Sequence, residues 1–171
     1  MTETSRPTGV IRVLVLCTGN SARSQIAEAL FARAGGERLV VASAGTHPAD
    51  RVHPDAVAQL REMGIDWSAA RPKTIDAVIN DPWDLIITVC DNAQESCPVF
   101  PGRATFAHWG MPDPAGVKDP ETRKRAFRDV AQVLSRRIDL MLALRPEELS
   151  ALAYEERLRQ IGRDDMPVGT P

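Results

Sequence analysis

Two apolar segments that each end at a cysteine constrain the fold more than any other feature of this sequence. The first is Val10 to Cys17 (VIRVLVLC), and the second is Trp83 to Cys90 (WDLIITVC). Short apolar runs that are rich in β-branched residues and bounded by turn formers are typical of strands buried on both faces. Such strands occur in parallel sheets covered by helices, so the sequence predicts an α/β protein.

Segments with helical periodicity separate the predicted strands. The strands are predicted at 10–17, 38–44, 83–90 and 105–109, and the helices at 22–34, 54–63, 120–144 and 146–161. A polar segment at 91–96 is compatible with a helix but consists largely of weak helix formers. In parallel sheets ligands bind at the carboxyl ends of the strands, so Cys17 and Cys90 are expected at the same ligand-binding edge.

The composition describes one globular domain. The chain has 171 residues, 43% of them hydrophobic, and its 21 Lys plus Arg against 23 Asp plus Glu give a formal charge of −2. A chain of this length buries about 70% of its unfolded surface, so its core needs no disulfide or structural metal. We expect a single domain over 1–171, with a core at 8–144 and a C-terminal helical extension and tail at 145–171.

Charge and hydropathy argue against several kinds of partner. A mildly negative chain gains little from nucleic acid or from an anionic membrane surface, so neither is expected. The polar first residues cannot form the core of a signal peptide, and no apolar stretch approaches the roughly 20 residues that cross a bilayer. A cytoplasmic protein is therefore expected. In that reducing compartment three cysteines indicate chemistry more than a disulfide framework.

The loop after the first strand has the composition of an anion-binding site. A short loop that turns into a helix points successive N–H groups inward, where they and the helix dipole favour a bound oxyanion. An arginine at the start of the helix adds a planar fork for two oxygens of a tetrahedral anion. The residues expected to line the site are Thr18, Gly19, Asn20, Ser21, Ala22 and Arg23.

Cys17 stands at the beginning of this loop. The positive field of the loop is expected to lower its thiol pKa from about 8.5 to about 4–7, which would make it a thiolate at neutral pH. Ser24 could donate a hydrogen bond to the same sulfur. A buried cysteine followed by an ordinary turn is the alternative interpretation.

Cys90 and Cys97 are two further thiols. In a regular helix their sulfurs would lie about 9–10 Å apart along the axis, so a disulfide between them requires the segment to unwind. The weak helix formers and Pro98 permit this. Two inert buried thiols are an alternative. A zinc site is a weaker one, because structural zinc uses closely spaced cysteine pairs, and no metal is expected.

Asp113 lies in a Met-Pro-Asp-Pro segment after the last predicted strand, again at the ligand edge. The flanking prolines fix its backbone, which suits an acid that hands a proton to a leaving oxygen. A solvated turn aspartate is the alternative.

Four segments, CTGNSARSQIAEAL, SAGTHP, TVCDNAQESCPVFPG and HWGMPDPAG, follow one another along the chain. Together they resemble the thioredoxin-coupled arsenate reductases, which are built on the low-molecular-weight tyrosine phosphatase fold. The resemblance covers about residues 12–144. It implies a three-layer α/β/α fold with a four-stranded parallel sheet.

The resemblance also implies a role for each candidate residue. Cys17 would be the nucleophile, Ser24 would stabilise its thiolate, Asp113 would be the general acid, and Cys90 with Cys97 would form a redox relay. The loop through Arg23 would bind arsenate, with phosphate or sulfate as competing oxyanions. Thioredoxin would reduce the final disulfide, no cofactor would be needed, and a monomer is expected.

One position departs from the family pattern. In some members Asn20, Glu28 and Ser43 help to hold a potassium ion together with an aspartate, and this chain has Lys73 where that aspartate is expected. The lysine ammonium could take the place of the cation. Weak or absent stimulation by potassium is therefore expected.

Other functions remain open on the sequence alone. A low-molecular-weight protein tyrosine phosphatase would use Cys17, Arg23 and Asp113 in the same way but needs neither Cys90 nor Cys97. A non-enzymatic regulator that binds oxyanions or arsenite is a second alternative, although no basic DNA-reading helix is found. A reductase that uses glutathione with glutaredoxin is a third.

Overall fold

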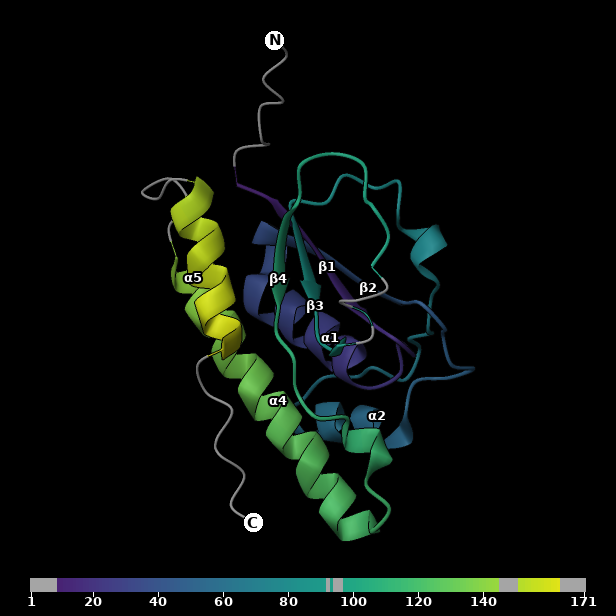
Figure 1. Cartoon of the computed structure of the whole chain (residues 1–171). Coiled ribbons are helices and arrows are strands. Elements are labelled where there is room, and N and C mark those ends of the chain that lie inside the picture. Colours follow the sequence, from purple (N-terminus) through teal and green to yellow (C-terminus); the bar gives the residue numbers. More distant parts are fainter. Residues whose placement is uncertain (1–8, 92, 94–96, 145–150, 164–171) are drawn as a thin grey trace.

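The computed structural model describes residues 9–91, 93, 97–144 and 151–163 (Figure 1). Four parallel strands form one sheet in the order β2-β1-β3-β4. They are β1 (Ile11–Cys17), β2 (Leu39–Gly45), β3 (Leu85–Thr88) and β4 (Thr105–His108). The predicted α/β fold with a four-stranded parallel sheet is confirmed.

The two inner strands, β1 and β3, carry the centre of the core. All of β3 and residues 13–16 of β1 are buried, which explains why both sequences are apolar without alternation. β3 is shorter than the predicted range 83–90. Before it, the Trp83 indole turns inward and donates to Val78 O (2.8 Å). After it, Val89 N still donates to Leu16 O (3.0 Å), and Cys90 then leaves the sheet.

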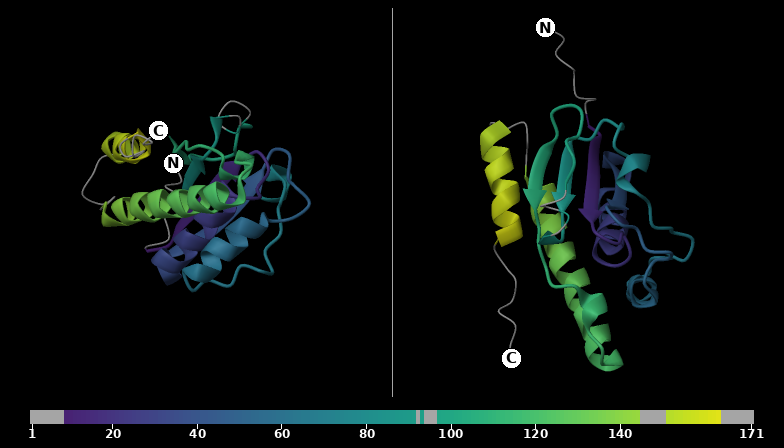
Figure 2. Two further views of the ribbon diagram at one scale, coloured as in Figure 1. Left: turned by 90° about the horizontal axis from the view of Figure 1, so that it is seen from below. Right: turned by 45° about the vertical axis from the view of Figure 1, so that its right-hand side comes forward.

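Helices flank the sheet, and their starts follow from local chemistry. They are α1 (Arg23–Gly35), α2 (Pro54–Glu62), α4 (Pro120–Ala143) and α5 (Ala151–Arg163), with short 3-10 turns η1 (Gly36–Arg38), η2 (Ile75–Ala77) and η3 (Pro114–Gly116). α2 and α4 begin at prolines, whose missing N–H is harmless in a first turn. α1 packs against α4, α2 contacts both, and α5 lies along β4 and α4 (Figure 2).

α4 buries the apolar face that its periodicity predicts, and one polar residue with it. Phe127, Leu134 and Met141 are among the buried side chains, whereas the apolar residues Val133 and Leu142 are only half-buried. Arg137 was not predicted to be inside and is 1% exposed.

Some predicted elements lie partly outside the described residues. Of the helix-compatible segment 91–96 only residues 91 and 93 are described, and the predicted helix 146–161 is described from residue 151, where α5 begins. Within the described ranges, no helix combines the length and the apolar content that crossing a membrane requires.

Candidate active site

A loop from residue 17 to residue 23 joins β1 to α1 at the carboxyl edge of the sheet, and a second loop after β2 holds its carbonyl groups. The pairs are Thr46 N to Cys17 O (3.3 Å), His47 N to Thr18 O (2.9 Å), Ala49 N to Gly19 O (2.9 Å) and His53 N to Ser21 O (2.8 Å). In a trans peptide the C=O and the following N–H point in opposite directions. The N–H groups of these peptides therefore turn away from the second loop, toward the side where an anion can bind.

Gly45, the last residue of β2, allows the two loops to approach each other. A Cβ atom at this position would lie 2.5 Å from Thr18 O and 3.0 Å from Asn20 N, so no side chain fits. The sequence analysis missed this role. A glycine at the end of a strand that neighbours the anion-binding loop is the signal that could have found it.

Asn20 fixes the shape of the loop from inside. It is fully buried, and its φ of 48° is a left-handed conformation, which asparagine tolerates better than most residues. Its Nδ2 donates to Ser24 Oγ (2.9 Å) and to Ser43 Oγ (2.8 Å). Its Oδ1 accepts from Lys73 N (2.8 Å) and from Gln25 Nε2 (3.0 Å). Every polar position of the Asn20 amide is thus occupied by a named partner.

Gln25 is a second supporting residue that the sequence analysis missed. Besides Asn20 Oδ1, its Nε2 bonds to Asn20 O (3.1 Å), and its Oε1 accepts from the Trp67 indole (2.8 Å). Its complete burial is visible only in the structure, so the sequence offered no clear signal for this role.

Cys17 is 3% exposed, and its sulfur has two polar neighbours. Ser24 Oγ lies 2.8 Å from Sγ, and Asn20 N donates to Sγ over 3.1 Å. Because Ser24 Oγ already accepts from the Asn20 amide, its single hydrogen is available for the sulfur. In its thiolate form Cys17 therefore has two donors, the Ser24 hydroxyl and Asn20 N.

Burial nevertheless raises the pKa of the Cys17 thiol above its ordinary value, against the lowering effect of the hydrogen bonds from Ser24 and Asn20. The predicted lowering of this pKa is wrong. The sequence pattern shows the donors around the sulfur but not its depth, and loss of water disfavours the thiolate.

Arg23 connects the loop at 17–23, called the oxyanion loop below, to the loop that carries Asp113. Its Nη1 donates to Met111 O (2.9 Å), and its Nη2 lies 4.0 Å from Asp113 Oδ2. The Asp113 side chain is 53% exposed, and its Oδ1 accepts from Ala115 N (3.0 Å) at the start of η3. The structure therefore brings these two predicted site residues together.

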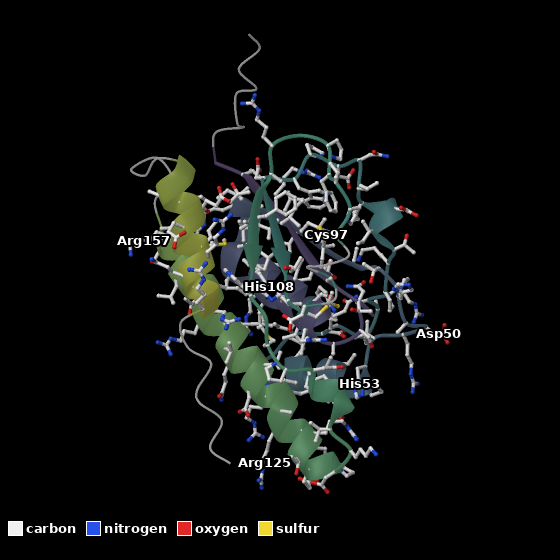
Figure 3. The ribbon with its side chains drawn as sticks, viewed as in Figure 1. Asp50, His53, Cys97, His108, Arg125 and Arg157 are labelled. Carbon is white, nitrogen blue, oxygen red and sulfur yellow. The ribbon has the colours of Figure 1, made fainter. Side chains whose placement is uncertain are left out.

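Cys90 lies beside the oxyanion loop, and Cys97 lies farther along the chain. The buried Cys90 Sγ is 3.3 Å from Thr18 Oγ1 and accepts from Ala93 N over 3.4 Å. Cys97 is half-buried, which raises its pKa, and its Sγ lies 3.6 Å from Pro98 O. Figure 3 shows Cys97 over the sheet and His53 near the start of α2. All three cysteines are free thiols.

Lys73 places an ammonium group beside Glu28. Lys73 Nζ is 3.6 Å from Glu28 Oε1, and burial raises the pKa of this carboxyl while Lys73 lowers it. Asn20 Oδ1, a ligand expected for potassium in the family, accepts hydrogen bonds from Lys73 N and Gln25 instead. These residues do not fit a potassium ion, because an internal cation and hydrogen-bond donors take its place.

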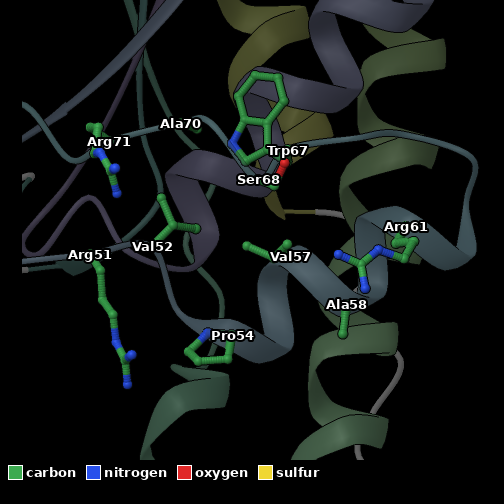
Figure 4. Close-up of a pocket in the computed structure, with 10 residues that line it drawn as sticks. All are labelled: Arg51, Val52, Pro54, Val57, Ala58, Arg61, Trp67, Ser68, Ala70 and Arg71. Carbon is green, nitrogen blue, oxygen red and sulfur yellow. The ribbon is translucent and has the colours of Figure 1, made fainter.

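A groove of about 380 Å³ lies between α2 and the segment at 67–71 (Figure 4). Trp67, Val57 and three arginines are among the residues that line it, but none of the predicted site residues does. Its link to the oxyanion loop is Arg51, whose carbonyl accepts from Ser21 Oγ (3.0 Å).

The histidines have structural partners. His53 Nδ1 accepts from Asp55 N (3.0 Å), and His108 bonds to Thr88 Oγ1 (2.7 Å) and to Asp91 Oδ1 (2.9 Å). Among the residues that the structure describes, no three His, Cys, Asp or Glu side chains gather as a metal site.

The inner strand β1 of this parallel sheet ends in a cysteine, and a loop of inward N–H groups and an arginine follow it. This arrangement defines the class of phosphatase-like α/β enzymes. Comparison with known families agrees with this class. The sequence pattern described as low molecular weight phosphotyrosine protein phosphatase matches residues 12–153. The chain belongs to this family.

Individual relatives within the family carry a more specific name. An arsenate reductase from Brevibacillus brevis is 43% identical over 112 residues, which are 66% of this chain and 83% of the relative. The structure titled an arsenate reductase in the phosphate binding state has a TM-score of 0.63 at 30% identity and covers 78% of this chain and 98% of that one. A thioredoxin-dependent arsenate reductase from Corynebacterium glutamicum has a TM-score of 0.57 at 32% identity, over 79% of this chain and 65% of that one.

Proposed function

We propose that this protein reduces arsenate to arsenite through a disulfide relay of Cys17, Cys90 and Cys97 that thioredoxin regenerates. The observation that carries the proposal is the position of Cys90, whose Sγ lies 3.3 Å from Thr18 Oγ1 in the oxyanion loop. Hydrolysis of a phosphate ester has no use for a second thiol beside the nucleophile. Reduction of an oxyanion needs one, because two sulfurs must give up the two electrons. The relatives named arsenate reductase support the same activity.

The oxyanion loop binds arsenate. The inward N–H groups of residues 18–22 and the N-terminal end of α1 attract the negative charge, and the Arg23 guanidinium contacts two oxygens. Phosphate and sulfate share the tetrahedral shape and charge and therefore compete for the loop.

The first step joins sulfur to arsenic. The Cys17 sulfur attacks arsenic(V), and the thiol proton moves to an arsenate oxygen. An As–O bond breaks, and Asp113 gives its proton to the departing hydroxyl, which leaves as water. Arsenic is still pentavalent in the Cys17 adduct, and Asp113 is then a carboxylate. Ser24 and Asn20 N donate to the sulfur and stabilise the charge that develops on it during this step.

The second step transfers the electrons. Cys90 attacks the Cys17 sulfur, an S–S bond forms, and the S–As bond breaks with its electron pair on arsenic. The Cys90 thiol proton passes to an arsenic-bound oxygen, and arsenic, now arsenic(III), leaves as arsenite. Cys97 then attacks Cys90, which releases Cys17 as a thiol and moves the disulfide to Cys90–Cys97. The loop is then free for another arsenate.

Thioredoxin is the proposed reductant, because a dithiol can attack the Cys90–Cys97 disulfide by exchange. Cys97 is the most accessible of the three cysteines, as attack by another protein requires. We also propose that the protein works as a cytoplasmic monomer without a cofactor of its own.

A coupled assay tests the proposed function. Arsenate, thioredoxin, thioredoxin reductase and NADPH are mixed with the protein, and NADPH oxidation is followed beside a phosphate-ester hydrolysis assay. Oxidation that requires arsenate and thioredoxin is expected. Rapid ester hydrolysis with no arsenate-dependent oxidation would overturn the proposal and favour the phosphatase. Oxidation supported only by glutathione and glutaredoxin would show that they, and not thioredoxin, are the reductant. The proposed arsenate reductase activity would stand.

A further inference from the structure

Arg137 is a charged residue inside the apolar face of α4. It is 1% exposed, between the buried residues Leu134 and Met141. A guanidinium in such a position is tolerated only when its N–H groups have hydrogen-bond acceptors. Arg137 Nη1 donates to Trp109 O (3.1 Å) and Gly110 O (3.4 Å), and Nη2 donates to Gly162 O (3.2 Å).

These acceptors come from two segments that are far apart in the sequence. Trp109 and Gly110 begin the loop that leads to Asp113, whereas Gly162 lies at the end of α5. Figures 1 and 2 show α5 running beside β4 and α4, so the guanidinium lies where all three elements meet. Arg137 therefore ties the loop at 109–113, called the acid loop below, to the C-terminal helix through backbone carbonyls of both segments.

Two further contacts join the same segments. The Trp109 indole donates to Leu158 O of α5 (3.0 Å). Gly162 packs so closely that a Cβ there would lie 2.3 Å from His108 O and 2.6 Å from the Trp109 ring. The Trp109 ring itself stacks on Phe31 of α1, with ring centroids 5.9 Å apart.

The acid loop is thus held by arginines at three consecutive carbonyls. Arg137 holds residues 109 and 110, and Arg23 holds Met111 through its Nη1. Asp113 follows two residues later between two prolines, which transmit the position of the loop to its carboxyl group because they restrict the backbone. Arg23 belongs to the oxyanion site, but Arg137 does not touch it.

We infer that Arg137 is a positioning residue for the general acid, and that α5, which supplies its third acceptor, is part of the catalytic apparatus. The family match ends at residue 153, so most of α5 lies beyond the part of the chain that the family shares. The inference rests on the proposed role of Asp113. The inferred role of the C-terminal helix is to hold the acid loop in the position where Asp113 can protonate the leaving oxygen.

The test is a double-mutant cycle on the first chemical steps. Reduced protein is mixed with excess arsenate without thioredoxin, and the rate of arsenite release in a single turnover is measured for Arg137→Met, Asp113→Asn and the double variant. We expect Arg137→Met to slow release about tenfold or more, because a small displacement of a reacting group has effects of this size. In the Asp113→Asn background the same substitution should have almost no further effect.

Two milder variants keep the test valid if Arg137→Met does not fold. Trp109→Phe removes the donor to Leu158 O but keeps an aromatic ring, and Gly162→Ala pushes the end of α5 away from His108. Each should slow single-turnover release a few-fold and lose its effect in the Asp113→Asn background. The inhibition constant of phosphate, which reports on the oxyanion loop, should not change in any of them.

Met141→Ala is the matched control, because Met141 is equally buried one turn along the same helix. It should lower thermal stability without slowing arsenite release at a temperature where it is fully folded. The inference is overturned if the Arg137 or Gly162 variants slow release equally with and without Asp113, or if they do not slow it at all. It is also overturned if Met141→Ala slows release as much. If Asp113→Asn alone has no effect, the proposed acid is wrong and a different residue must be sought.

Discussion

The sulfurs of Cys17 and Cys97 are held in opposite ways. Cys17 is almost completely buried, and its two hydrogen-bond donors are themselves fixed by the Asn20 amide. Cys97 is half-buried, and its Sγ lies near the carbonyl of the next residue, Pro98. An immobile sulfur suits attack on a bound oxyanion, because the geometry is prepared in advance. A half-buried sulfur suits a relay, because it must first reach Cys90 and then be reached by another protein.

Cys90 stands between these extremes. Its sulfur is buried and touches Thr18, yet it belongs to the segment that continues to Cys97. One molecule thus combines a hydrogen-bonded region, built on two loops and the sheet edge, with a half-buried thiol at Cys97.

The largest expected effect is on turnover in Cys97→Ser. If Cys97 only moves the disulfide onward, the variant should reduce one arsenate per molecule and then stop, with a Cys17–Cys90 disulfide trapped. Mass spectrometry of peptides from the reacted, unreduced protein detects this bond. Cys17→Ser should release no arsenite at all.

Val99→Ser is a suitable control, because Val99 is a highly exposed residue near Cys97. It should turn over as the unmodified protein does. Continued turnover by Cys97→Ser would show that Cys97 is not needed for the relay. A protein that stops after one turnover without a Cys17–Cys90 disulfide would show that these two sulfurs do not form the first disulfide.

The next effect concerns the acid at the hydrogen-bonded region. Asp113→Asn should slow single-turnover arsenite release by about 10² to 10³, the usual contribution of general acid catalysis. Asp119→Asn is the control, since Asp119 caps α4 in a similar exposed position but does not contact Arg23. An equal loss in both variants would show that the effect comes from the structure of the loop.

Ser24→Ala tests how the fixed sulfur is activated. Because burial raises the pKa of Cys17, the rate of its alkylation by iodoacetamide should rise with pH above neutrality. Removing the Ser24 donor takes away an interaction that lowers this pKa, so the profile should move to higher pH and the rate near pH 8 should fall about tenfold.

Ser21→Ala is the control for this profile, because the Ser21 hydroxyl bonds to Arg51 O and not to the sulfur. Its profile should coincide with that of the unmodified protein. A Ser24→Ala profile at the same or lower pH would show that Ser24 does not donate to Cys17. Cys97 is alkylated in parallel, so the rates are measured peptide by peptide.

The smallest effect is expected from potassium. At equal ionic strength, potassium and sodium salts should give the same melting temperature and the same rate, because the Lys73 ammonium already lies beside Glu28. A clear potassium-specific gain would contradict this account of the loop's support.

Lys73→Met should cost about 1 kcal/mol of stability at neutral pH, a modest value because Lys73 is partly exposed. Without Lys73 the pKa of Glu28, already raised by burial, rises further. A raised pKa in the folded state favours folding at acid pH and loses that contribution as pH rises. The variant should therefore be least stable, relative to the unmodified protein, near neutral pH. Lys124→Met, on an exposed pair with Glu121, should show no such trend.

The sheet and the contents of the oxyanion site followed from the sequence because each depends on local patterns. Continuous apolar runs predicted the inner strands, and the cysteine, asparagine and arginine after β1 predicted the anion-binding loop. The end of β3 was predicted two residues too late, because Cys90 is apolar enough to continue the pattern although it turns toward Thr18. Apolar character alone does not show where a strand leaves its sheet.

The supports of the site could not be predicted, because they join residues far apart in the chain. Gly45 allows two loops to approach each other closely. Arg137 donates to a carbonyl of the loop after β4 and to a carbonyl of α5. The same reason explains the error in the pKa of Cys17. Local sequence indicated its hydrogen-bond donors, whereas its burial depends on how all the layers pack above it.

The Asn20 side chain has a consequence for variation at this position. Its nitrogen donates to two serines, and its oxygen accepts from a backbone N–H and from Gln25, so the amide has a single correct orientation. Aspartate has almost the same shape but no donor, and it would face Ser24 and Ser43 with an acceptor. Asn20→Asp replaces the side-chain NH2 group by an oxygen and keeps the volume nearly the same. It would therefore turn the Ser24 hydrogen toward the carboxylate and away from Cys17. At this position the direction of hydrogen bonding, and not size, selects the residue.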